Sequence, residues 1–80
     1  MRIAVLLFAR YGEVAGVSSI EVEVPPGATL SQVWEAVQAR VPGLRRETAP
    51  LLARDRAYAR PEQTVQPGDE IAAFPPVSGG

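Results

Sequence analysis

The sequence predicts an α+β fold in which one main helix packs on one face of a mixed sheet of four to five strands. Two observations lead to this prediction. Along the 80-residue chain, two strand-like segments are followed by one helix-like segment and then by further strand-like segments, an order typical of a hairpin with a covering helix. The first and last strand-like segments are both rich in apolar residues, which is explained if they lie side by side as central, parallel strands.

The first two strands are expected at residues 2–9 and 20–24. Residues 2–9, RIAVLLFA, are apolar with few interruptions, which predicts a central strand buried on both faces. Residues 20–24, IEVEV, alternate strictly between apolar and acidic side chains, which predicts a half-exposed strand paired with the first as a hairpin. The stretch between them, residues 10–18, contains Gly12 and Gly16 and is interpreted as a connection.

The main helix is predicted to begin after Thr29. Thr29 and Gln32 have the spacing of a capping box, in which each side chain satisfies a free backbone N–H at the other position, and Pro42-Gly43 ends the helix near residue 40 or 41. Trp34 could stack on a ligand, but its helical spacing with other apolar residues favours core packing. The predicted apolar stripe consists of Leu30, Val33, Trp34, Val37 and Val41.

The C-terminal half is predicted to contain three short strands. Residues 51–54 and 57–60 are interpreted as strands joined by a tight turn at Asp55-Arg56, and residues 44–50 as a loop or a short helical turn. Residues 70–74, EIAAF, are interpreted as the last strand, because the two prolines that follow cannot continue the ladder. The strand boundaries between residue 44 and residue 66 stay open at this point.

The composition argues against a self-contained enzyme. The chain has no cysteine, no histidine and no lysine, since all eight basic residues are arginine. These absences remove the commonest general base, the best thiol nucleophile and the amine that forms Schiff bases. The carboxylates do not follow a calcium-loop spacing, so neither a metal site nor a catalytic residue is predicted. No apolar stretch approaches the roughly 18 residues of a membrane span, and no secretory signal is recognised, so we expect a cytoplasmic protein without membrane association.

One segment of the chain is markedly basic. Residues 40–60 hold six arginines against Glu47 and Asp55, a net charge of +4 within a chain whose net charge is −1. A solvated face is the favoured interpretation, because no glycine-rich or interleaved aromatic pattern of a nucleic-acid binder accompanies the arginines. Nucleic acid is not expected as a partner, and docking to an acidic protein surface is the functional alternative.

Three segments carry a likeness to a known family. They are LLFA at 6–9, PGDEIAAF at 67–74 and FPPVSGG at 74–80. With these segments and the placement of the helix, the chain resembles the MoaD/ThiS family of sulfur carriers, which have a ubiquitin-like β-grasp fold. Within that family it is most similar to the MoaD type, the small subunits of molybdopterin synthase.

The resemblance implies a sulfur-donor subunit without catalytic side chains of its own. In this family an ATP-dependent adenylating enzyme activates the C-terminal carboxyl group, here that of Gly80, and a sulfurtransferase supplies the sulfur of the resulting thiocarboxylate. The sulfur is then delivered, inside a larger catalytic subunit, to a pyranopterin precursor of the molybdenum cofactor. The implied assembly is a heterotetramer with that large subunit. No bound cofactor is implied, because the ATP is used by the activating partner.

Two parts are expected along the chain: a β-grasp domain at 1–74 and an extended, flexible Gly-Gly tail at 75–80. Prolines hold a chain near polyproline geometry, which rises about 3.1 Å per residue, so residues 75–80 could project roughly 18 Å. Glycines have no Cβ to obstruct a narrow active site. The residues expected to thread into a partner are Pro75, Pro76, Val77, Ser78 and Gly79, with Gly80 as the covalent site.

Two phenylalanines are candidates for the partner interface. Phe74 lies where the last strand meets the tail, and Phe8 would join it if the first and last strands are neighbours. Aromatic side chains are frequent anchors in interfaces. Core packing is the alternative for both; it is favoured for Phe8 and equally weighted with the interface for Phe74.

The sequence does not decide which molecule accepts the sulfur or the activated C-terminus. The chain could carry sulfur for thiamine or for tRNA thiolation, or it could be a ubiquitin-like modifier that forms an isopeptide with a target lysine. The FPPV sequence at 74–77 favours the molybdenum branch, because it is most similar to the tail of that subunit.

Overall fold

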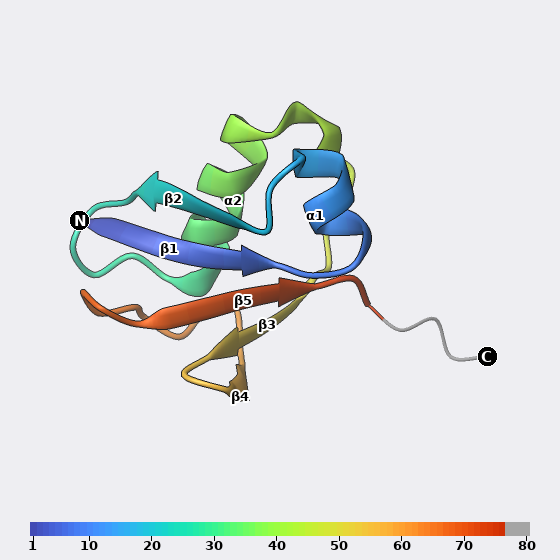
Figure 1. The fold of residues 1–80 in the computed structure, drawn as a ribbon. Coiled ribbons are helices and arrows are strands. Elements are labelled where there is room, and N and C mark those ends of the chain that lie inside the picture. Colours follow the sequence, from blue (N-terminus) through green and yellow to red (C-terminus); the bar gives the residue numbers. More distant parts are fainter. Residues whose placement is uncertain (77–80) are drawn as a thin grey trace.

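The computed structural model describes residues 1–76, which form one sheet with two α-helices and a short 3₁₀ helix (Figure 1). The predicted order of strand, strand, helix and three further strands is confirmed. In chain order the elements are β1 (Arg2–Leu7), α1 (Arg10–Ala15), β2 (Ser19–Glu23), α2 (Leu30–Arg40), η1 (Pro42–Leu44), β3 (Leu51–Arg54), β4 (Ala57–Ala59) and β5 (Glu70–Phe74).

The sheet is mixed, with the strand order β2-β1-β5-β3-β4. β1 and β5, the first and last strands of the chain, lie side by side in parallel, with Leu6 opposite Ala72. The other neighbours are antiparallel: β2 pairs with β1, and β3 pairs with both β5 and β4. The predicted central, parallel pair is therefore confirmed, and its C-terminal ends point in the same direction (Figure 1).

Helix α2 lies across one face of the sheet, and its start is set by local sequence (Figure 1). The predicted capping box is present: the Gln32 backbone N–H donates to Thr29 Oγ1 at 3.2 Å, and the Thr29 backbone N–H donates to Gln32 Oε1 at 2.8 Å. Trp34 is buried in the core, as predicted, and its indole N–H donates to the carbonyl oxygen of Glu47 at 2.7 Å. The helix residues that are buried against the sheet are Leu30, Val33, Trp34 and Val37.

The prediction that the first strand is buried on both faces is wrong. Along β1, Ile3, Val5 and Leu7 are buried, whereas Ala4 and Phe8 are exposed. The cause is that α2 covers only one face, so each second side chain points away from the core. An apolar run in a sequence does not reveal how many faces of the strand will be covered.

The prediction that residues 10–18 form only a connection is also wrong, because α1 occupies residues 10–15. Gly12 lies inside this helix, where a Cβ would approach the carbonyl oxygen of Leu7 to 2.9 Å. The glycine therefore permits close packing of α1 on the end of β1. Tyr11 on the same helix is fully buried. A six-residue helix has little stability of its own, so this packing is what maintains it.

The C-terminal half matches the predicted strands closely. β3 occupies residues 51–54, as predicted, and β4 is one residue shorter than predicted. The turn between them has positive φ at both central residues, 50° at Asp55 and 70° at Arg56, as two-residue hairpin turns of type I′ require. Within residues 44–50, the part predicted to be a loop or helical turn, only Leu44 belongs to the 3₁₀ helix η1.

The arginine-rich segment at 40–60 makes contacts with several separate parts of the molecule. Arg40 donates to the carbonyl oxygen of Glu21 on β2 at 2.9 Å, whereas Arg54 donates to Asp69 Oδ2 at 2.8 Å. Arg56 lies 3.7 Å from a carboxylate oxygen of Glu70. These arginines are thus divided between the β2 edge and the β3–β4 region, and the three contacts do not belong to one basic patch. Among residues 1–76, no helix is long and apolar enough to cross a membrane.

Candidate functional site

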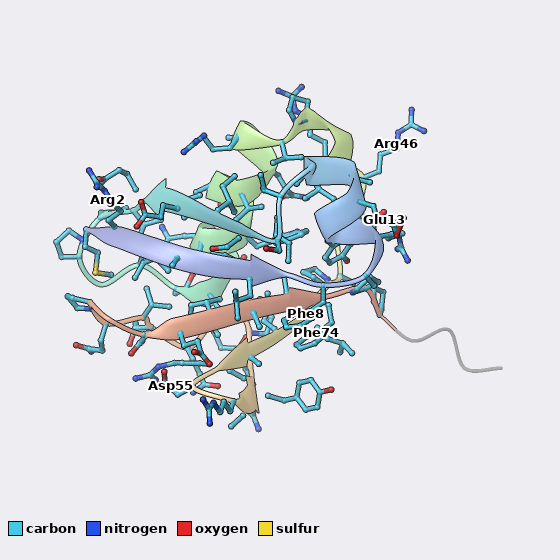
Figure 2. The ribbon with its side chains drawn as sticks, in the orientation of Figure 1. Arg2, Phe8, Glu13, Arg46, Asp55 and Phe74 are labelled. Carbon is cyan, nitrogen blue, oxygen red and sulfur yellow. The ribbon has the colours of Figure 1, made fainter. Side chains whose placement is uncertain are left out.

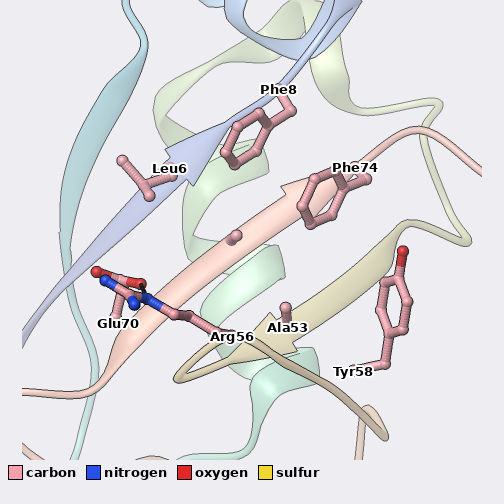
Figure 3. Close-up of a pocket in the computed structure, with 8 residues that line it drawn as sticks. Leu6, Phe8, Ala53, Arg56, Tyr58, Glu70 and Phe74 are labelled. Carbon is pink, nitrogen blue, oxygen red and sulfur yellow. Dashed lines mark ion pairs between the residues drawn. The ribbon is translucent and has the colours of Figure 1, made fainter.

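The candidate site lies on the face of the sheet that α2 does not cover, and we call the hollowed part of this face the open face. A hollow of about 350 Å³ lies on it, between side chains of β1, β3, β5 and the β3–β4 hairpin (Figure 3). The open face is defined by the residues that line this hollow: Leu6, Phe8, Ala53, Arg56, Tyr58, Glu70, Ala72 and Phe74.

Strand register explains why the open face is hollowed. Leu6 on β1 lies opposite Ala72 on β5, and Ala72 lies opposite Ala53 on β3. These three residues form one row across the sheet, and two of them carry only a methyl group. Tyr58 on β4 lies opposite Ala53 and continues the row, and the rings of Phe8 and Phe74 stand two residues further along the chain from Leu6 and Ala72 (Figure 3). Small residues at the centre and aromatic residues at the side therefore create the hollow.

Phe8 and Phe74, the two phenylalanines predicted to meet a partner, lie against each other at the C-terminal ends of β1 and β5 (Figure 2). Their ring centroids are 4.5 Å apart and the ring planes differ by 10°, so the rings are stacked. The backbone N–H of Phe8 donates to the carbonyl oxygen of Ala73 at 3.1 Å, which extends the parallel pairing by one residue.

The core interpretation of Phe8 is wrong, because 41% of its surface is exposed. Phe8 follows the buried Leu7 and so points to the opposite face of the sheet, where no element of the described chain covers it. Phe74 is partly buried beneath the stacked ring and beside Tyr58. The stack lies at the surface and is not part of the core cluster.

Tyr58 is the largest contributor to the site that sequence reasoning missed. Its ring stands edge-on to Phe74, with centroids 6.3 Å apart and planes at 68°, and 76% of its surface is exposed. Leu6, Ala53 and Ala72 were missed as well. Alternation along β1 and β5 is a signal that could have placed Leu6 and Ala72 beside the phenylalanines. The hairpin that contains Tyr58 was predicted, but nothing in the sequence relates Tyr58 to Phe74, because their contact also depends on how β3 pairs with β5.

The open face has the features of a docking surface. Exposed aromatic rings expend little conformational entropy on binding and bury a large area, and a contiguous apolar patch on a small protein commonly marks an interaction site. Arg56 and Glu70 form an exposed ion pair at one side of the hollow. An apolar centre with a charged margin is the usual anatomy of an interface.

The start of the tail lies directly beside the open face. β5 ends at Phe74, and Pro75 and Pro76 follow it on the surface. A second hollow, of about 460 Å³, lies around this point; its lining residues are Ala9, Arg10, Leu51, Tyr58, Phe74, Pro75 and Pro76. A partner that contacts Phe74 is therefore adjacent to the residue from which the tail departs. The remaining predicted tail residues, Val77, Ser78, Gly79 and Gly80, lie outside the described residues.

Arg10 and Tyr11 on α1 form a cluster with Glu47, which connects this helix to the loop after η1. Arg10 donates to Glu47 Oε1 at 2.7 Å, and its guanidinium lies 5.5 Å from the centre of the Tyr11 ring. The Tyr11 hydroxyl is buried near the Glu47 carboxylate but has no partner with hydrogen-bond geometry. Burial, with a smaller contribution from the negative charge of Glu47, raises the pKa of Tyr11 to about 12. The Tyr11 side chain contributes to the core through its buried ring, and its hydroxyl is enclosed without a hydrogen-bond partner.

The ionisable groups near the open face are few. Within 1–76 no group of acidic side chains could hold a metal ion, and the ionisable side chains of the face are Arg56, Tyr58 and Glu70.

The chain matches one protein family and is similar to several known proteins. The ThiS family matches residues 5–80. The human molybdopterin synthase sulfur carrier subunit is 37% identical over 99% of this chain and 94% of its own length. Small archaeal modifier protein 1 of Haloferax volcanii is 36% identical over 92% of this chain and 95% of its own length.

Two solved structures share the fold. The crystal structure of the Haloferax volcanii modifier superposes with a TM-score of 0.88 at 31% identity, covering 100% of each chain. A putative molybdopterin converting factor subunit 1 from Pyrococcus furiosus superposes with a TM-score of 0.86 at 27% identity, covering 96% of this chain and 99% of its own. The predicted ubiquitin-like β-grasp fold is thereby confirmed for the described residues.

Proposed function

The chain belongs to the ThiS family, and from that premise we propose that it is the sulfur-carrier subunit of a molybdopterin synthase. The family predicted from the sequence is thus confirmed, whereas the chemical steps below are part of the proposal. The observation that carries the proposal is the position of the open face at the root of the tail. A partner that binds Phe8 and Phe74 would receive the tail that begins at Pro75.

The proposed reaction uses the carboxyl group of Gly80. The carboxylate attacks the α-phosphate of ATP, pyrophosphate leaves, and the acyl-adenylate so formed has a good leaving group in AMP. A donor of sulfur at the oxidation level of sulfide then displaces AMP and leaves a thiocarboxylate at Gly80. The thiocarboxylate sulfur forms a bond to a carbon of a pyranopterin precursor, and water cleaves the bond between this sulfur and the acyl carbon, which restores the carboxylate of Gly80. Since the chain has no cysteine, the C-terminus is the position on this chain best suited to carry sulfur covalently. The catalytic side chains and the ATP belong to the partners.

Three partners follow from this chemistry. They are an ATP-dependent adenylating enzyme, a sulfurtransferase and the large catalytic subunit, with which the carrier would form a heterotetramer in the cytoplasm. The relative's name calls it a subunit, which supports assembly with another chain. Residues 1–74 would serve as the docking domain and residues 75–80 as an arm that reaches roughly 18 Å at about 3.1 Å per residue. Two prolines at the base of that arm reduce the entropy lost when it is threaded into a partner.

Reconstitution tests the proposal. The protein is incubated with ATP, the adenylating enzyme and a sulfur source from the same cell, and intact-protein mass spectrometry looks for replacement of one oxygen by sulfur. Adding the large subunit and the pterin precursor should then yield molybdopterin. The matched control is a chain that lacks Gly80, which should dock but deliver no sulfur. Molybdopterin formation by the shortened chain, or none by the full chain after thiocarboxylation, would contradict the proposal.

A second function has a specific observation in its favour. The Haloferax volcanii relative, which is similar over nearly the whole chain, is named a modifier protein. A modifier would use the same activated carboxyl group to form an isopeptide with a lysine of another protein, since this chain has no lysine of its own. Lysine-linked adducts in a cell extract, with no molybdopterin formed, would favour this function. Thiolated tRNA, or thiamine made from the thiocarboxylated protein, would favour the remaining carrier pathways.

A further inference from the structure

The turn of the β3–β4 hairpin is bonded to the first residue of β5. Three non-glycine residues of the described chain have positive φ: Ala9 in the turn before α1, and Asp55 and Arg56 in this hairpin turn. The backbone N–H of Asp55 donates to the carbonyl oxygen of Glu70 at 2.8 Å, and Asp55 Oδ1 accepts from the backbone N–H of Glu70 at 3.0 Å. Asp55 and Glu70 are thus bonded in both directions, although Asp55 lies outside β3.

These two bonds extend the β3–β5 ladder into the turn. Arg54 lies opposite Ile71, so Asp55 and Glu70 are the next pair in the same register. In a regular antiparallel ladder, a bonded pair of residues exchanges two backbone hydrogen bonds. Because the chain turns at Asp55, its carboxylate supplies the acceptor that a backbone carbonyl supplies in a regular strand. Aspartate and asparagine suit this position, since both tolerate positive φ and carry an acceptor on a short side chain.

The hairpin is attached to the rest of the sheet through β3. β4 is the edge strand and pairs with β3, so the position of the whole hairpin depends on the β3–β5 ladder. At one end of this ladder, the ring of Phe74 packs against two other aromatic rings. At the other end lies the Asp55–Glu70 pair. The open face is therefore secured by aromatic contacts beside the tail and by Asp55 at the hairpin turn.

Asp55 also determines where the charged margin of the open face lies. Arg56 directly follows Asp55, and Glu70 is the residue to which Asp55 is bonded; both line the hollow. Their side chains approach to 3.7 Å (Figure 3), with 88% of the Arg56 side chain and 53% of the Glu70 side chain exposed. An ion pair this exposed contributes little to holding either residue. The placement of both charges therefore depends on the backbone bonds at Asp55.

We propose that Asp55 is a positioning residue, whose carboxylate oxygen holds the hairpin turn on Glu70 so that Arg56 and Glu70 present their charges to the partner in a fixed arrangement. The inference rests on the proposed function in its choice of partner, the large subunit, whereas its structural part concerns the free protein. Charges fixed at the margin of an apolar centre favour one docking orientation, and order present before binding reduces the entropy lost on binding.

Two variants isolate the acceptor oxygen. Asp55→Asn keeps an oxygen that can accept the bond, and Asp55→Gly removes it. Both remove the negative charge and both accept positive φ, so they differ mainly in the acceptor and in backbone freedom. Arg56→Gly controls for backbone freedom, because it adds a glycine to the same turn and leaves the Asp55 side chain in place. The ion pair between Arg54 and Asp69, at 2.8 Å, lies beside the turn and is retained in all three variants.

The first measurement needs no partner. Amide hydrogen exchange followed by NMR reports on the bond that the Glu70 N–H donates. In Asp55→Gly this amide should exchange about tenfold faster than in the wild type, whereas in Asp55→Asn and Arg56→Gly its rate should stay within about twofold. Unchanged exchange in Asp55→Gly, or equally fast exchange in Arg56→Gly, would overturn the proposal whatever the function of the protein.

The second measurement is affinity for the large molybdopterin synthase subunit of the same cell. Asp55→Gly should bind about three- to tenfold more weakly than Asp55→Asn. Thr29→Ala serves as the control for stability, because it removes the N-cap of α2 on the face that this helix covers. It should lower the melting temperature and leave the affinity unchanged. Equal loss of affinity in Thr29→Ala would overturn the positioning role, because lower stability alone would then explain the effect.

A double background tests whether Asp55 acts through the charged margin. Arg56→Ala combined with Glu70→Ala removes both charges and keeps the backbone N–H of Glu70. In this background the difference in affinity between Asp55→Gly and Asp55→Asn should fall below about twofold. A difference that persists in full would overturn the positioning role. Failure of the wild type to bind the large subunit would contradict the proposed function, while exchange of the Glu70 amide still decides what Asp55 does in the free protein.

Discussion

The two faces of the sheet are built from the same strands and are both apolar, yet they have different consequences for the molecule. On β1, Ile3, Val5 and Leu7 point to the covered face and are buried, while Leu6 and Phe8 point to the open face. On β5, Ile71 and Ala73 belong to the core cluster, while Phe74 and the small side chain of Ala72, which is 9% exposed, line the open face. The covered face is closed by α2 (Figure 1). The comparison shows that apolar content alone does not assign a residue to stability or to binding, because the presence of a covering layer decides between them.

The largest expected effect is on the covered face. Ile71→Ala removes a side chain that is 1% exposed, and large-to-alanine changes in cores cost about 2–5 kcal/mol of unfolding free energy. A chain of this length has a total stability of roughly 4–12 kcal/mol at 0.05–0.15 kcal/mol per residue. Urea unfolding followed by circular dichroism measures the loss. A cost below about 1 kcal/mol would contradict the assignment of Ile71 to a tightly packed core.

The matched change on the open face is Phe74→Ala, on the same strand. Loss of the stack with Phe8 should cost about 0.5–1.5 kcal/mol of stability beyond the loss of buried area, and that area is small because Phe74 is only partly buried. The affinity for the large subunit should fall by roughly thirtyfold, the value for loss of an interface anchor worth about 2 kcal/mol. Isothermal titration calorimetry measures the affinity. If Phe74→Ala destabilised the fold as much as Ile71→Ala and left binding intact, the division between the two faces would be wrong.

The smallest expected effect comes from removing the hydroxyl of Tyr11, a buried residue of the core. Tyr11→Phe removes a buried hydroxyl that has no hydrogen-bond partner and should stabilise the fold at neutral pH by about 1 kcal/mol. Since the pKa of Tyr11 is raised from 10.0 to about 12 in the folded protein, the unfolded state releases this proton first as pH rises. Wild-type stability should therefore decline between pH 10 and 12.

The advantage of the Tyr11→Phe variant should accordingly widen at high pH. Urea unfolding of both proteins at pH 7 and near pH 11 provides the comparison. A constant difference between the two proteins would mean that Tyr11 ionises as readily in the folded state as in the unfolded one.

The elements that sequence reasoning placed correctly are those with local signals. The start of α2 was predictable because Thr29 and Gln32 bond to each other across three residues, and the β3–β4 turn was predictable from the short interval between two strand-like segments. α1 was missed because Gly12 opposes helix formation locally. The packing of α1 on the end of β1, which leaves no room for a Cβ at Gly12, and the burial of Tyr11 favour the helix, and both are tertiary.

The candidate site was predictable only in part, for the same reason. Phe8 and Phe74 were selected because a parallel pairing of the first and last strands would bring them together, and that pairing is present. Tyr58 was not selected, because its distance to Phe74 depends on the β3–β4 and β3–β5 registers together. Whether Phe8 was core or surface could not be read from an apolar run.

The sequence by itself determined the order of the elements, the capped start of α2 and the family, because these depend on neighbouring residues and on short motifs. The tertiary structure decided which face of the sheet stays open, where α1 forms, and that Ala9 adopts a conformation its own preferences disfavour. Each of these outcomes depends on contacts with residues distant in the chain, such as the bond of Phe8 to Ala73 and that of Arg10 to Glu47. Packing and hydrogen bonding at such contacts outweigh local preferences of about 1 kcal/mol per residue.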